Sequence, residues 1–308
     1  MATHLYTHAA CLEHDPGRHH PERPARLAAV LQALEGEAFE ALMRREAPRA
    51  AADRLKLVHD PRYVDDLLNA IPAQGVIHLD PDTAVSPGSG EAALRAAGAV
   101  VAGVDAVMAG EADRAFCAVR PPGHHAEADR AMGFCLFNNV AVGALHAMER
   151  HGCRRVAVVD FDVHHGNGTQ HMFERNPNLM YASSHQFPYY PGTGAARETG
   201  VGNIVNAPLP AGANGALFRE AYQRRILPAL DAFQPDLLLI SAGFDAHADD
   251  PLAGLGLHED DFAWVTAELV TLARRHARGR VVSTLEGDYD LEALAASAAA
   301  HVRALMAA

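Results

Sequence analysis

The sequence contains few cysteines, and no two of them are close together. Four occur in the 308 residues, with no CxxC pair among them. This spacing excludes a disulfide framework and a thiolate zinc site, and it predicts a protein of a reducing, cytoplasmic compartment. The four are Cys11, Cys117, Cys135 and Cys153.

Basic residues are also in short supply. The chain has 26 Lys and Arg against 38 Asp and Glu, which gives a formal net charge of −12 at pH 7. Binding to nucleic acid depends largely on cationic side chains that displace counterions from phosphates. The sequence therefore predicts no nucleic-acid partner, whereas a neutral or cationic substrate is compatible with its charge.

Long uninterrupted apolar runs and linker segments are absent as well. The N-terminal "MATHLYTHAA" lacks the basic and apolar segments of a signal peptide, and the longest apolar stretch, residues 96–110, is broken by Gly and Asp. No Pro/Gly/Ser-rich boundary and no repeat divides the chain. We expect a soluble protein with one domain over residues 1–308, no membrane partner and either a monomeric or an oligomeric state.

Short apolar runs alternate with helical patterns along the chain. Strands are predicted at 115–119, 156–160, 179–184, 203–209, 236–243 and 280–287. Ala- and Leu-rich helices are predicted at 91–109, 138–150, 215–232 and 259–278, with a closing helix over 291–306. This alternation predicts an α/β fold in which a mainly parallel central sheet is covered by helices on both faces.

Polar residues directly follow five of the predicted strands. These segments are "RPPGHHAE", "DFDVHHGNG", "SSHQF", "SAGFDAHADDP" and "LEGDYD". In open α/β sheets the ligand lies outside the carboxyl ends of the strands. The five segments are therefore predicted to meet at one site.

The segment "DFDVHHGNG", residues 160–168, has the composition of a metal site. If the strand stays extended to its end, Asp160, Asp162 and His164 lie on one side of it and need a cation to offset their repulsion. Asp245 follows another strand end, after two small residues that allow close approach. Asp162, His164 and Asp245 would leave one position open, as in catalytic zinc sites, although an acid-rich set also suits iron or manganese. The alternative is a solvated loop with one ion pair.

Two further motifs supply groups for acid–base chemistry. The adjacent His124 and His125 follow a rigid Pro-Pro-Gly turn and would serve as an electrostatic partner and a general base beside a metal. Tyr289, in "LEGDYD", could donate its hydroxyl to a developing oxyanion. Taken singly, an exposed histidine pair and a packed turn tyrosine are the simpler interpretations.

The motifs "RPPGHHA", "DFDVHHGNGTQ", "SSHQFPYYPGTG", "SAGFDAHADDPL" and "LEGDYD", in this order, resemble the zinc-dependent histone deacetylase family, which has the arginase/deacetylase fold. The resemblance begins at "HHPERPARL" (19–27) and covers nearly the whole chain. It is closest to bacterial deacetylase-like and class II members, judging by Asn167 and "SAGFD".

The resemblance implies a hydrolase that removes an acetyl or other short acyl group from an acylated lysine or a small acyl-amine. One catalytic Zn²⁺ would be bound by Asp162, His164 and Asp245. His125 would be the general base and later the acid, His124 would assist electrostatically, and Tyr289 would donate to the oxyanion.

The family also implies roles for the residues around these groups. Asp160 would hold His124, and Asn167 would stand behind His125. A K⁺ ion would lie among Asp160, Asp162, His164 and Ser183, and the substrate channel would be formed by Gly133, Phe134, Tyr190 and Leu252.

Three positions depart from the pattern of the family. Asn167 stands where class I members carry an acid, which predicts a base that stays neutral more readily at pH 7. Asp288 replaces a glycine before the tyrosine, which stiffens the turn and adds charge. Tyr190 replaces a phenylalanine and makes one channel wall more polar.

Several alternatives stay open at the level of sequence. Leu252 occupies a position where a polyamine-preferring relative carries glutamate, which favours an acyl-lysine or a comparable small amide over a polyamine. An acetylpolyamine or other small-amide amidohydrolase of the same family is the alternative. A two-metal phosphoesterase would need a GDxxD-type segment, which is missing, and a dimanganese ureohydrolase would need aspartates at His164 and Tyr289. A catalytically silent acyl- or metal-binding module would be expected to have lost the histidine pair or the tyrosine.

Overall fold

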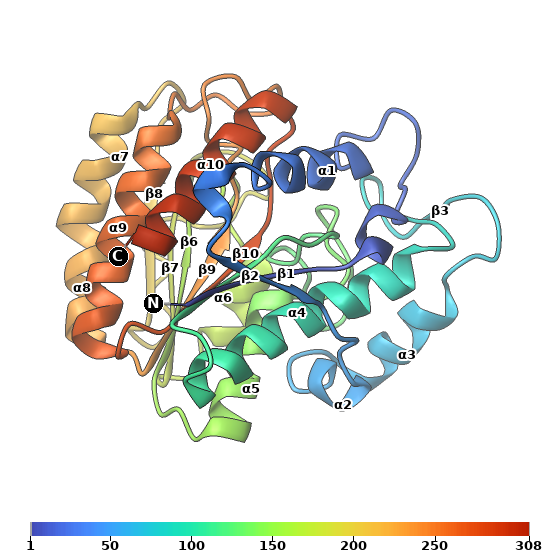
Figure 1. Ribbon diagram of the computed structural model, residues 1–308, viewed down its shortest axis with the longest axis horizontal. Coiled ribbons are helices and arrows are strands. Elements are labelled where there is room, and N and C mark those ends of the chain that lie inside the picture. Colours follow the sequence, from blue (N-terminus) through green and yellow to red (C-terminus); the bar gives the residue numbers. More distant parts are fainter. Residues whose placement is uncertain (1, 308) are drawn as a thin grey trace.

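The computed structural model describes residues 2–307 and is built around a sheet of eight strands (Figure 1). All neighbouring strands run parallel, in the order β2-β1-β5-β10-β9-β6-β7-β8. The last strand of the chain, β10, therefore lies in the middle of the sheet. The strands are β1 (Thr3–Thr7), β2 (Leu42–Glu46), β5 (Arg114–Cys117), β6 (Val156–Asp160), β7 (Leu179–Gln186), β8 (Ile204–Leu209), β9 (Leu237–Ala242) and β10 (Val281–Leu285).

Helices cover both faces of this sheet, as Figure 1 shows, with α4 and α5 on one side and α7 to α10 on the other. This confirms the predicted fold class. The helices are α1 (Pro24–Ala33), α2 (Ala52–Leu55), α3 (Pro61–Asn69), α4 (Ser89–Ala109), α5 (Asn139–His151), α6 (Asn167–Phe173), α7 (Gly215–Ala221), α8 (Leu227–Phe233), α9 (Glu259–His276) and α10 (Leu291–Ala307). Two 3₁₀ turns (Ala9–Leu12 and Glu37–Phe39), a π-helical turn (Tyr222–Ile226) and a two-stranded antiparallel hairpin, β3 (Ile77–His78) and β4 (Ala84–Val85), complete the described elements.

The strands at the centre of the sheet are buried because both of their faces are covered. Every residue of β6, β7, β9 and β10 is buried, and their sequences are continuous apolar runs up to the polar ends. This is the pattern expected of parallel strands packed between two helical layers. The apolar runs hold the strands in place, so their carboxyl ends can carry polar groups at fixed positions.

Two details differ from the sequence-based expectations. The segment 215–232 is not one helix, because a π-helical turn at Tyr222–Ile226 separates α7 from α8. The extension of the strand through His164 is wrong, because β6 ends at Asp160 and the following residues form a loop. Hydrogen bonds from the backbone N–H groups of Asp162 and His164 to the aspartates two residues earlier turn the chain there.

Among the described residues, one helix is long and apolar enough to cross a membrane, and it is a core helix. By length and composition α4 could cross a membrane, but 67% of that stretch is buried inside the structure. It packs on β1, β5 and β10 and against α5. Its apolar composition is therefore explained by its position between the sheet and a neighbouring helix.

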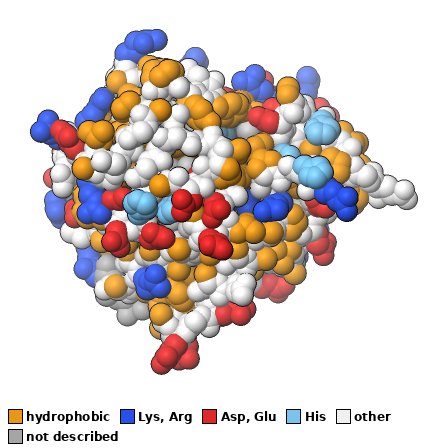
Figure 2. All heavy atoms as spheres, turned by 90° about the horizontal axis from the view of Figure 1, so that it is seen from above, with side chains coloured by type: hydrophobic (Ala, Val, Ile, Leu, Met, Phe, Trp, Pro, Cys, Tyr) orange, Lys and Arg blue, Asp and Glu red, His pale blue; other side chains and the backbone are white. Residues whose placement is uncertain are grey.

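Charged side chains of both signs are mixed on the face drawn in Figure 2, with no continuous basic area. All four cysteines are buried and free, as their spacing predicted. Burial raises the pKa of the Cys117 thiol and of the Cys135 thiol. These thiols are therefore packed as neutral side chains.

Candidate active site

The polar segments that follow β5, β6, β9 and β10 meet at the carboxyl edge of the sheet. The backbone N–H groups of Gly123 and His124 donate to Glu286 after β10, at 2.6 and 3.2 Å. The N–H of Val163 after β6 donates to Asp245 Oδ1 after β9, at 2.8 Å. Hydrogen bonds thus join the segment after β5 to the segment after β10, and the segment after β6 to the segment after β9. Glu286 is a buried member of this site that the sequence analysis did not single out.

Asp162, His164 and Asp245 form a tight cluster at this edge. His164 Nδ1 lies 3.1 Å from Asp162 Oδ1 and 3.1 Å from Asp245 Oδ2, and one ligand atom from each residue lies within 4.8 Å of the others. Ligands of a tetrahedral zinc ion are about 3.3 Å apart, given metal–ligand bonds of about 2.0–2.2 Å. The geometry and the donor set of two carboxylates and one imidazole fit a Zn²⁺ ion.

Two glycines allow the carboxylates to come this close. A Cβ atom on Gly243 would lie 2.0 Å from Asp162 Oδ2, and one on Gly287 would lie 2.0 Å from Asp245 Oδ2. No side chain fits at either position without moving a carboxylate, so the backbone itself forms the wall of the cluster. The close approach predicted for Gly243 is present.

The electrostatics of the cluster require a positive charge. Burial, together with repulsion from Asp162, raises the pKa of Asp245 to about 7. Burial alone would lower the pKa of His164, but hydrogen bonds with Asp162 and Asp245 raise it well above its usual value. An imidazolium held between two buried carboxylates supplies the charge that a metal ion would otherwise supply.

The described residues contain two other groups with ligand-type side chains, and neither has this geometry. Nε2 of His146 and of His151 both lie on one oxygen, Asp105 Oδ1, at 2.7 and 2.6 Å, which is hydrogen-bond spacing. The group His247, His258 and Glu259 lies at the N-terminus of α9, where the helix dipole disfavours a cation. The Asp162 cluster is therefore the candidate metal centre.

The paired histidines lie beside this cluster with different partners. His124 Nδ1 is 2.9 Å from Asp160 Oδ2, while His125 Nδ1 is 2.8 Å from Asn167 Oδ1. Burial alone would lower the pKa of His124, but the carboxylates of Asp162 and Asp160 raise it to about 10. Burial and the nearby His124 hold the pKa of His125 well below its usual range. One histidine is therefore a cation and the other is a neutral base.

A pocket of about 200 Å³ leads to His125 and His164. Tyr190 meets the His125 ring edge-on, with the ring centroids 5.2 Å apart, and Tyr289 meets Phe134 edge-on at 5.8 Å. The lining contains all four residues that the resemblance assigns to the channel. It also contains three residues assigned to catalysis or metal binding and two, Asp82 and Tyr189, that were assigned to neither. The full lining is Asp82, His125, Gly133, Phe134, His164, Tyr189, Tyr190, Leu252 and Tyr289.

Those two residues have definite positions in the pocket. Tyr189 stacks on the His164 ring with centroids 5.6 Å apart, and its hydroxyl donates to the Leu252 carbonyl. Asp82 accepts the backbone N–H of Gly133 at 3.1 Å. Tyr189 adjoins the predicted Tyr190 in the sequence, but only the folded loop shows that both tyrosines face the pocket. Asp82 lies in the segment between β3 and β4. From the sequence, Asp80 and Asp82 could meet a cationic substrate, although an acidic pair in such a segment is more typical of a solvated loop.

Tyr289 is positioned by a buried arginine. Arg26 donates to the backbone carbonyls of Glu286 and Asp288, both at 2.5 Å, and its guanidinium lies 5.0 Å from the centre of the Tyr289 ring. Arg26 itself is fixed by an ion pair with Glu22 at 3.1 Å. The N-terminal helix α1 thus holds the turn that carries the tyrosine, although the two are far apart in sequence.

Asp288, in the same turn, has an unfavourable environment. Its φ of 132° is in a region that side chains rarely adopt, and within residues 2–307 its Oδ2 atom is buried without a hydrogen-bond partner. Burial, with Asp250 and Asp245 nearby, raises the pKa of Asp288 to about 9. The turn therefore carries both backbone strain and a buried neutral carboxyl group. The prediction that Asp288 adds charge to the turn is wrong, because burial keeps its carboxyl group protonated at pH 7.

We expect Asp288→Gly to stabilise the chelator-treated protein by about 1–3 kcal/mol, the usual cost of such a backbone conformation. The wild-type carboxyl group is ionised in the unfolded chain above about pH 4 but stays protonated in the folded chain to about pH 9. Its contribution to wild-type stability therefore falls as pH rises through this window. Urea unfolding should show a larger gain at pH 8 than at pH 5. An equal or negative change at pH 8 would contradict this account.

The residues predicted to surround a monovalent ion lie side by side in the sheet. Ser183 on β7 is the register partner of Asp160 on β6, and its hydroxyl lies 2.8 Å from His185 Nδ1. The Tyr181 hydroxyl donates to Asp160 Oδ2 at 2.9 Å. The placement of K⁺ at these residues stays a prediction.

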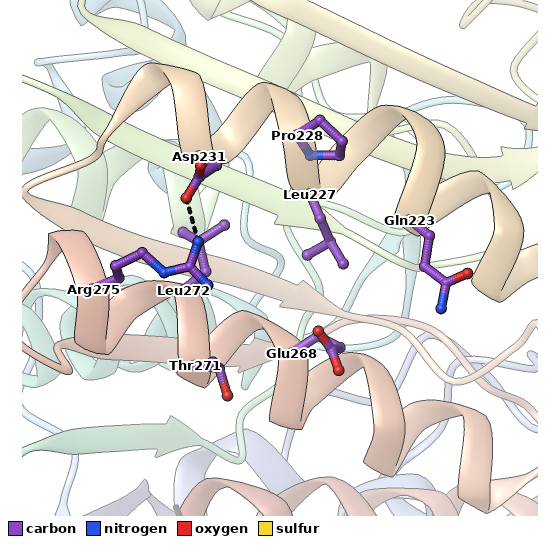
Figure 3. Close-up of a pocket in the computed structure, with 8 residues that line it drawn as sticks. All are labelled: Gln223, Leu227, Pro228, Asp231, Glu268, Thr271, Leu272 and Arg275. Carbon is purple, nitrogen blue, oxygen red and sulfur yellow. Dashed lines mark hydrogen bonds and ion pairs between the residues drawn. The ribbon is translucent and has the colours of Figure 1, made fainter.

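A larger hollow, of about 320 Å³, lies between α8 and α9 (Figure 3). Asp231 and Arg275 form an ion pair across it at 2.7 Å. The lining contains neither histidine nor cysteine: it is formed by Gln223, Leu227, Pro228, Asp231, Glu268, Thr271, Leu272 and Arg275. This hollow therefore lacks the combination of histidines and buried aspartates that is found at the carboxyl edge of the sheet.

Comparison with known proteins identifies the class of this site. The chain is 44% identical to the histone deacetylase-like amidohydrolase of Pseudomonas aeruginosa, over 87% of this chain and 71% of that protein. It is 38% identical to the human polyamine deacetylase HDAC10, over 92% of this chain but only 44% of that protein. Together with the fold and the site, these similarities define an amidohydrolase of the deacetylase type.

The family follows from two further comparisons. The sequence model of the family described as "Histone deacetylase domain" matches residues 20–305 of this chain. The crystal structure of the HDA15 HD domain matches with a TM-score of 0.93 and 35% identity, over 99% of this chain and 88% of that one. The chain belongs to the histone deacetylase family.

Proposed function

We propose that the protein is a zinc-dependent hydrolase that removes an acetyl or other short acyl group from an acylated lysine or a similar amine. The observation that carries this proposal is the cluster of Asp162, His164 and Asp245 beside a neutral His125, with His125 and His164 both lining the pocket. A bound zinc ion would polarise the amide carbonyl and acidify a water molecule.

The residues of the chain supply the other parts of the reaction. His125 is neutral and takes a proton from water, then returns it to the leaving amine. His124, charged and held by Asp160, adds positive charge beside the reacting carbonyl. The Tyr289 hydroxyl donates to the oxyanion. Phe134 and Tyr190 enclose the site and exclude water from it.

The shape of the pocket favours an extended, unbranched substrate. Aromatic rings on its walls suit the methylene chain of lysine, which binds through apolar contact. Asp82, an acid in the lining, suits an amide N–H or a cationic neighbour of the substrate chain. We also propose that Asp160, Asp162, His164 and Ser183 surround a K⁺ ion that steadies the strand ends.

An assay on purified protein tests the proposed function. Zinc-loaded protein is compared on acetyl-lysine peptides, acetylpolyamines and small acyl amides, with and without a hydroxamate chelator, and metal per chain is measured in the same samples. We expect one zinc per chain and chelator-sensitive amide hydrolysis. Two transition-metal ions per chain would point to a dinuclear hydrolase, and binding of acyl substrates without hydrolysis would point to a silent module.

A polyamine substrate is the second candidate, because a named polyamine deacetylase is among the relatives. In this chain the position at which a polyamine-preferring relative carries glutamate is Leu252, which lines the pocket. We expect Leu252→Glu to raise the kcat/KM ratio of acetylpolyamine over acetyl-lysine peptide about tenfold, because a carboxylate there attracts the second amine. Leu252→Gln is the neutral control. An unchanged ratio in the glutamate variant would show that charge at this position does not select the substrate.

A further inference from the structure

The side-chain amide of Asn167 lies between the proposed base and a buried acid. Its Nδ2 atom donates to Glu127 Oε1 at 2.5 Å and to the backbone carbonyl of His125 at 3.2 Å. Both partners can only accept, because one is a carboxylate and the other is a carbonyl. The amide must therefore point its nitrogen at Glu127 and its oxygen at His125.

This orientation sets the proton on the His125 ring. Asn167 Oδ1 lies 2.8 Å from His125 Nδ1, and an amide oxygen can only accept. His125 Nδ1 must therefore carry the hydrogen, which leaves the lone pair on Nε2. An asparagine alone does not determine this choice, because its two ends have nearly the same shape and a rotation by 180° would present an NH₂ group instead. With the NH₂ group toward Nδ1, the proton of the neutral ring would move to Nε2, and the ring could not act as a base there.

Glu127 is held so that it remains an acceptor. His171 Nδ1 lies 2.8 and 2.9 Å from its two carboxylate oxygens. Asn167 and His171 are four residues apart on α6 and both contact Glu127. Burial alone would raise the pKa of Glu127, but hydrogen bonds from His171 and Asn167 lower it, so the group is a carboxylate at neutral pH. Glu127 is itself largely buried, whereas His171 reaches solvent.

We propose that Glu127 is a positioning residue for the reaction: it fixes the Asn167 amide, and thereby the tautomer of His125 that has its basic nitrogen free. A carboxylate in direct contact with His125 would not need such a partner, because both of its oxygens accept. In this chain the acid, Glu127, is separated from the base, His125, by the side chain of Asn167. This inference rests on the proposed function for the role of His125 as base, but the side-chain geometry stands without it.

The first test replaces the Glu127 carboxylate, which only accepts hydrogen bonds, with a glutamine amide, which can also donate them. In zinc-loaded Glu127→Gln we expect kcat to fall about tenfold with KM within twofold of wild type, which is the lower end of the effect of removing a supporting hydrogen bond. Glu174→Gln is the matched control, because Glu174 is a partly exposed carboxylate next to α6 that pairs with Arg175. Its kcat should match that of the wild type.

A second variant separates positioning from folding. In the double variant Glu127→Gln with Asn167→Asp, the acid and the amide exchange places: the aspartate accepts from His125 and the glutamine donates to the aspartate. We expect this pair to recover most of the kcat that Glu127→Gln loses, whereas Asn167→Asp alone puts two carboxylates 2.5 Å apart and lowers kcat. Failure of the double variant to recover, with melting temperatures equal to wild type, would overturn the proposal.

The tautomer is observed directly without any substrate. Long-range proton–nitrogen correlation spectra of histidine-labelled protein at pH 8, zinc-loaded and then chelated, are assigned to His125 by the signal missing in His125→Gln. We expect the hydrogen on Nδ1 in wild type and a mixture of both tautomers in Glu127→Gln. An unchanged tautomer in that variant overturns the inference even if the enzyme is active. An inactive wild type with the expected spectra would refute the proposed function and leave the positioning intact.

Discussion

Asp245→Asn is expected to abolish metal binding and to lower kcat/KM by at least about 10³-fold. Asp245 provides one of the three ligand atoms of the candidate centre, and a bound metal ion supplies several kcal/mol of stabilisation to the developing charge. Asparagine keeps the shape of the side chain but removes the charge that holds the cation. Metal content measured after dialysis, together with rates on an acetyl-lysine peptide, tests this prediction.

Thermal stability gives a second measurement on the same variant. A ligand that binds only the folded chain stabilises it, so chelation should lower the melting temperature of the wild type and leave that of Asp245→Asn unchanged. In the metal-free chain, burial and Asp162 raise the pKa of Asp245 to about 7. The carboxyl group is ionised in the unfolded chain above about pH 4 but stays protonated in the folded chain to about pH 7. Its contribution to stability therefore falls between these two pH values and stays low above them, so the neutral variant should be the more stable of the two metal-free proteins at pH 8.

Asp249→Asn is the matched control, because Asp249 follows the same strand end and its side chain is largely exposed. It should keep its metal, its rate and its chelator-dependent shift in melting temperature. A zinc-loaded, active Asp245→Asn would show that the ion lies elsewhere in the protein.

Tyr289→Phe is expected to lower kcat by about 10²–10³-fold, the usual cost of removing one donor to an oxyanion. The ring of Tyr289 is held by contacts that phenylalanine keeps, between Phe134 and the guanidinium of Arg26. No hydrogen bond to its hydroxyl is present among residues 2–307. The substitution therefore removes the proposed donor and little else.

The measurements for this variant are kcat, KM and melting temperature under the same buffer conditions. A fall in kcat with little change in KM is the sign of an interaction made mainly in the transition state. The melting temperature should stay within about 2 °C of the wild type, since the ring contacts remain. A kcat within threefold of the wild type would exclude Tyr289 as the oxyanion donor.

The central part of the sheet could be predicted because its strands are continuous apolar runs. Residues 156–160 were predicted as a strand, and β6 has the same bounds. The two strands nearest the N-terminus were not predicted. In β2, all residues after Leu42 are exposed, and three of those four are charged, so this edge strand has no apolar run to identify it. β1 is buried but short and half polar, and only its pairing with β2 and β5 makes it a strand.

The candidate ligands could be predicted because charged residues directly after a buried strand are costly to bury unless a cation or another partner compensates their charge. The local geometry could not, because strand periodicity does not describe a turn. After β6 the aspartate side chains accept N–H groups from the loop itself, which ends the extended conformation at Asp160. Tyr189 and Glu127 were missed for a related reason: their roles depend on contacts that appear only when α6 and the loop before Pro191 are folded.

The position of β10 has a consequence for synthesis of the protein on the ribosome. β10 pairs with β5 on one side and with β9 on the other, although it is the last strand to be made. Until residues 281–285 emerge, the nascent chain can hold only two partial sheets, each with an unpaired apolar edge that is prone to aggregate. His124 and His125 follow a strand of one partial sheet, whereas Asp162, His164 and Asp245 follow strands of the other. Premature termination just before this strand would therefore leave a product with two exposed, unpaired sheet edges, in which the residues of the candidate active site are not brought together.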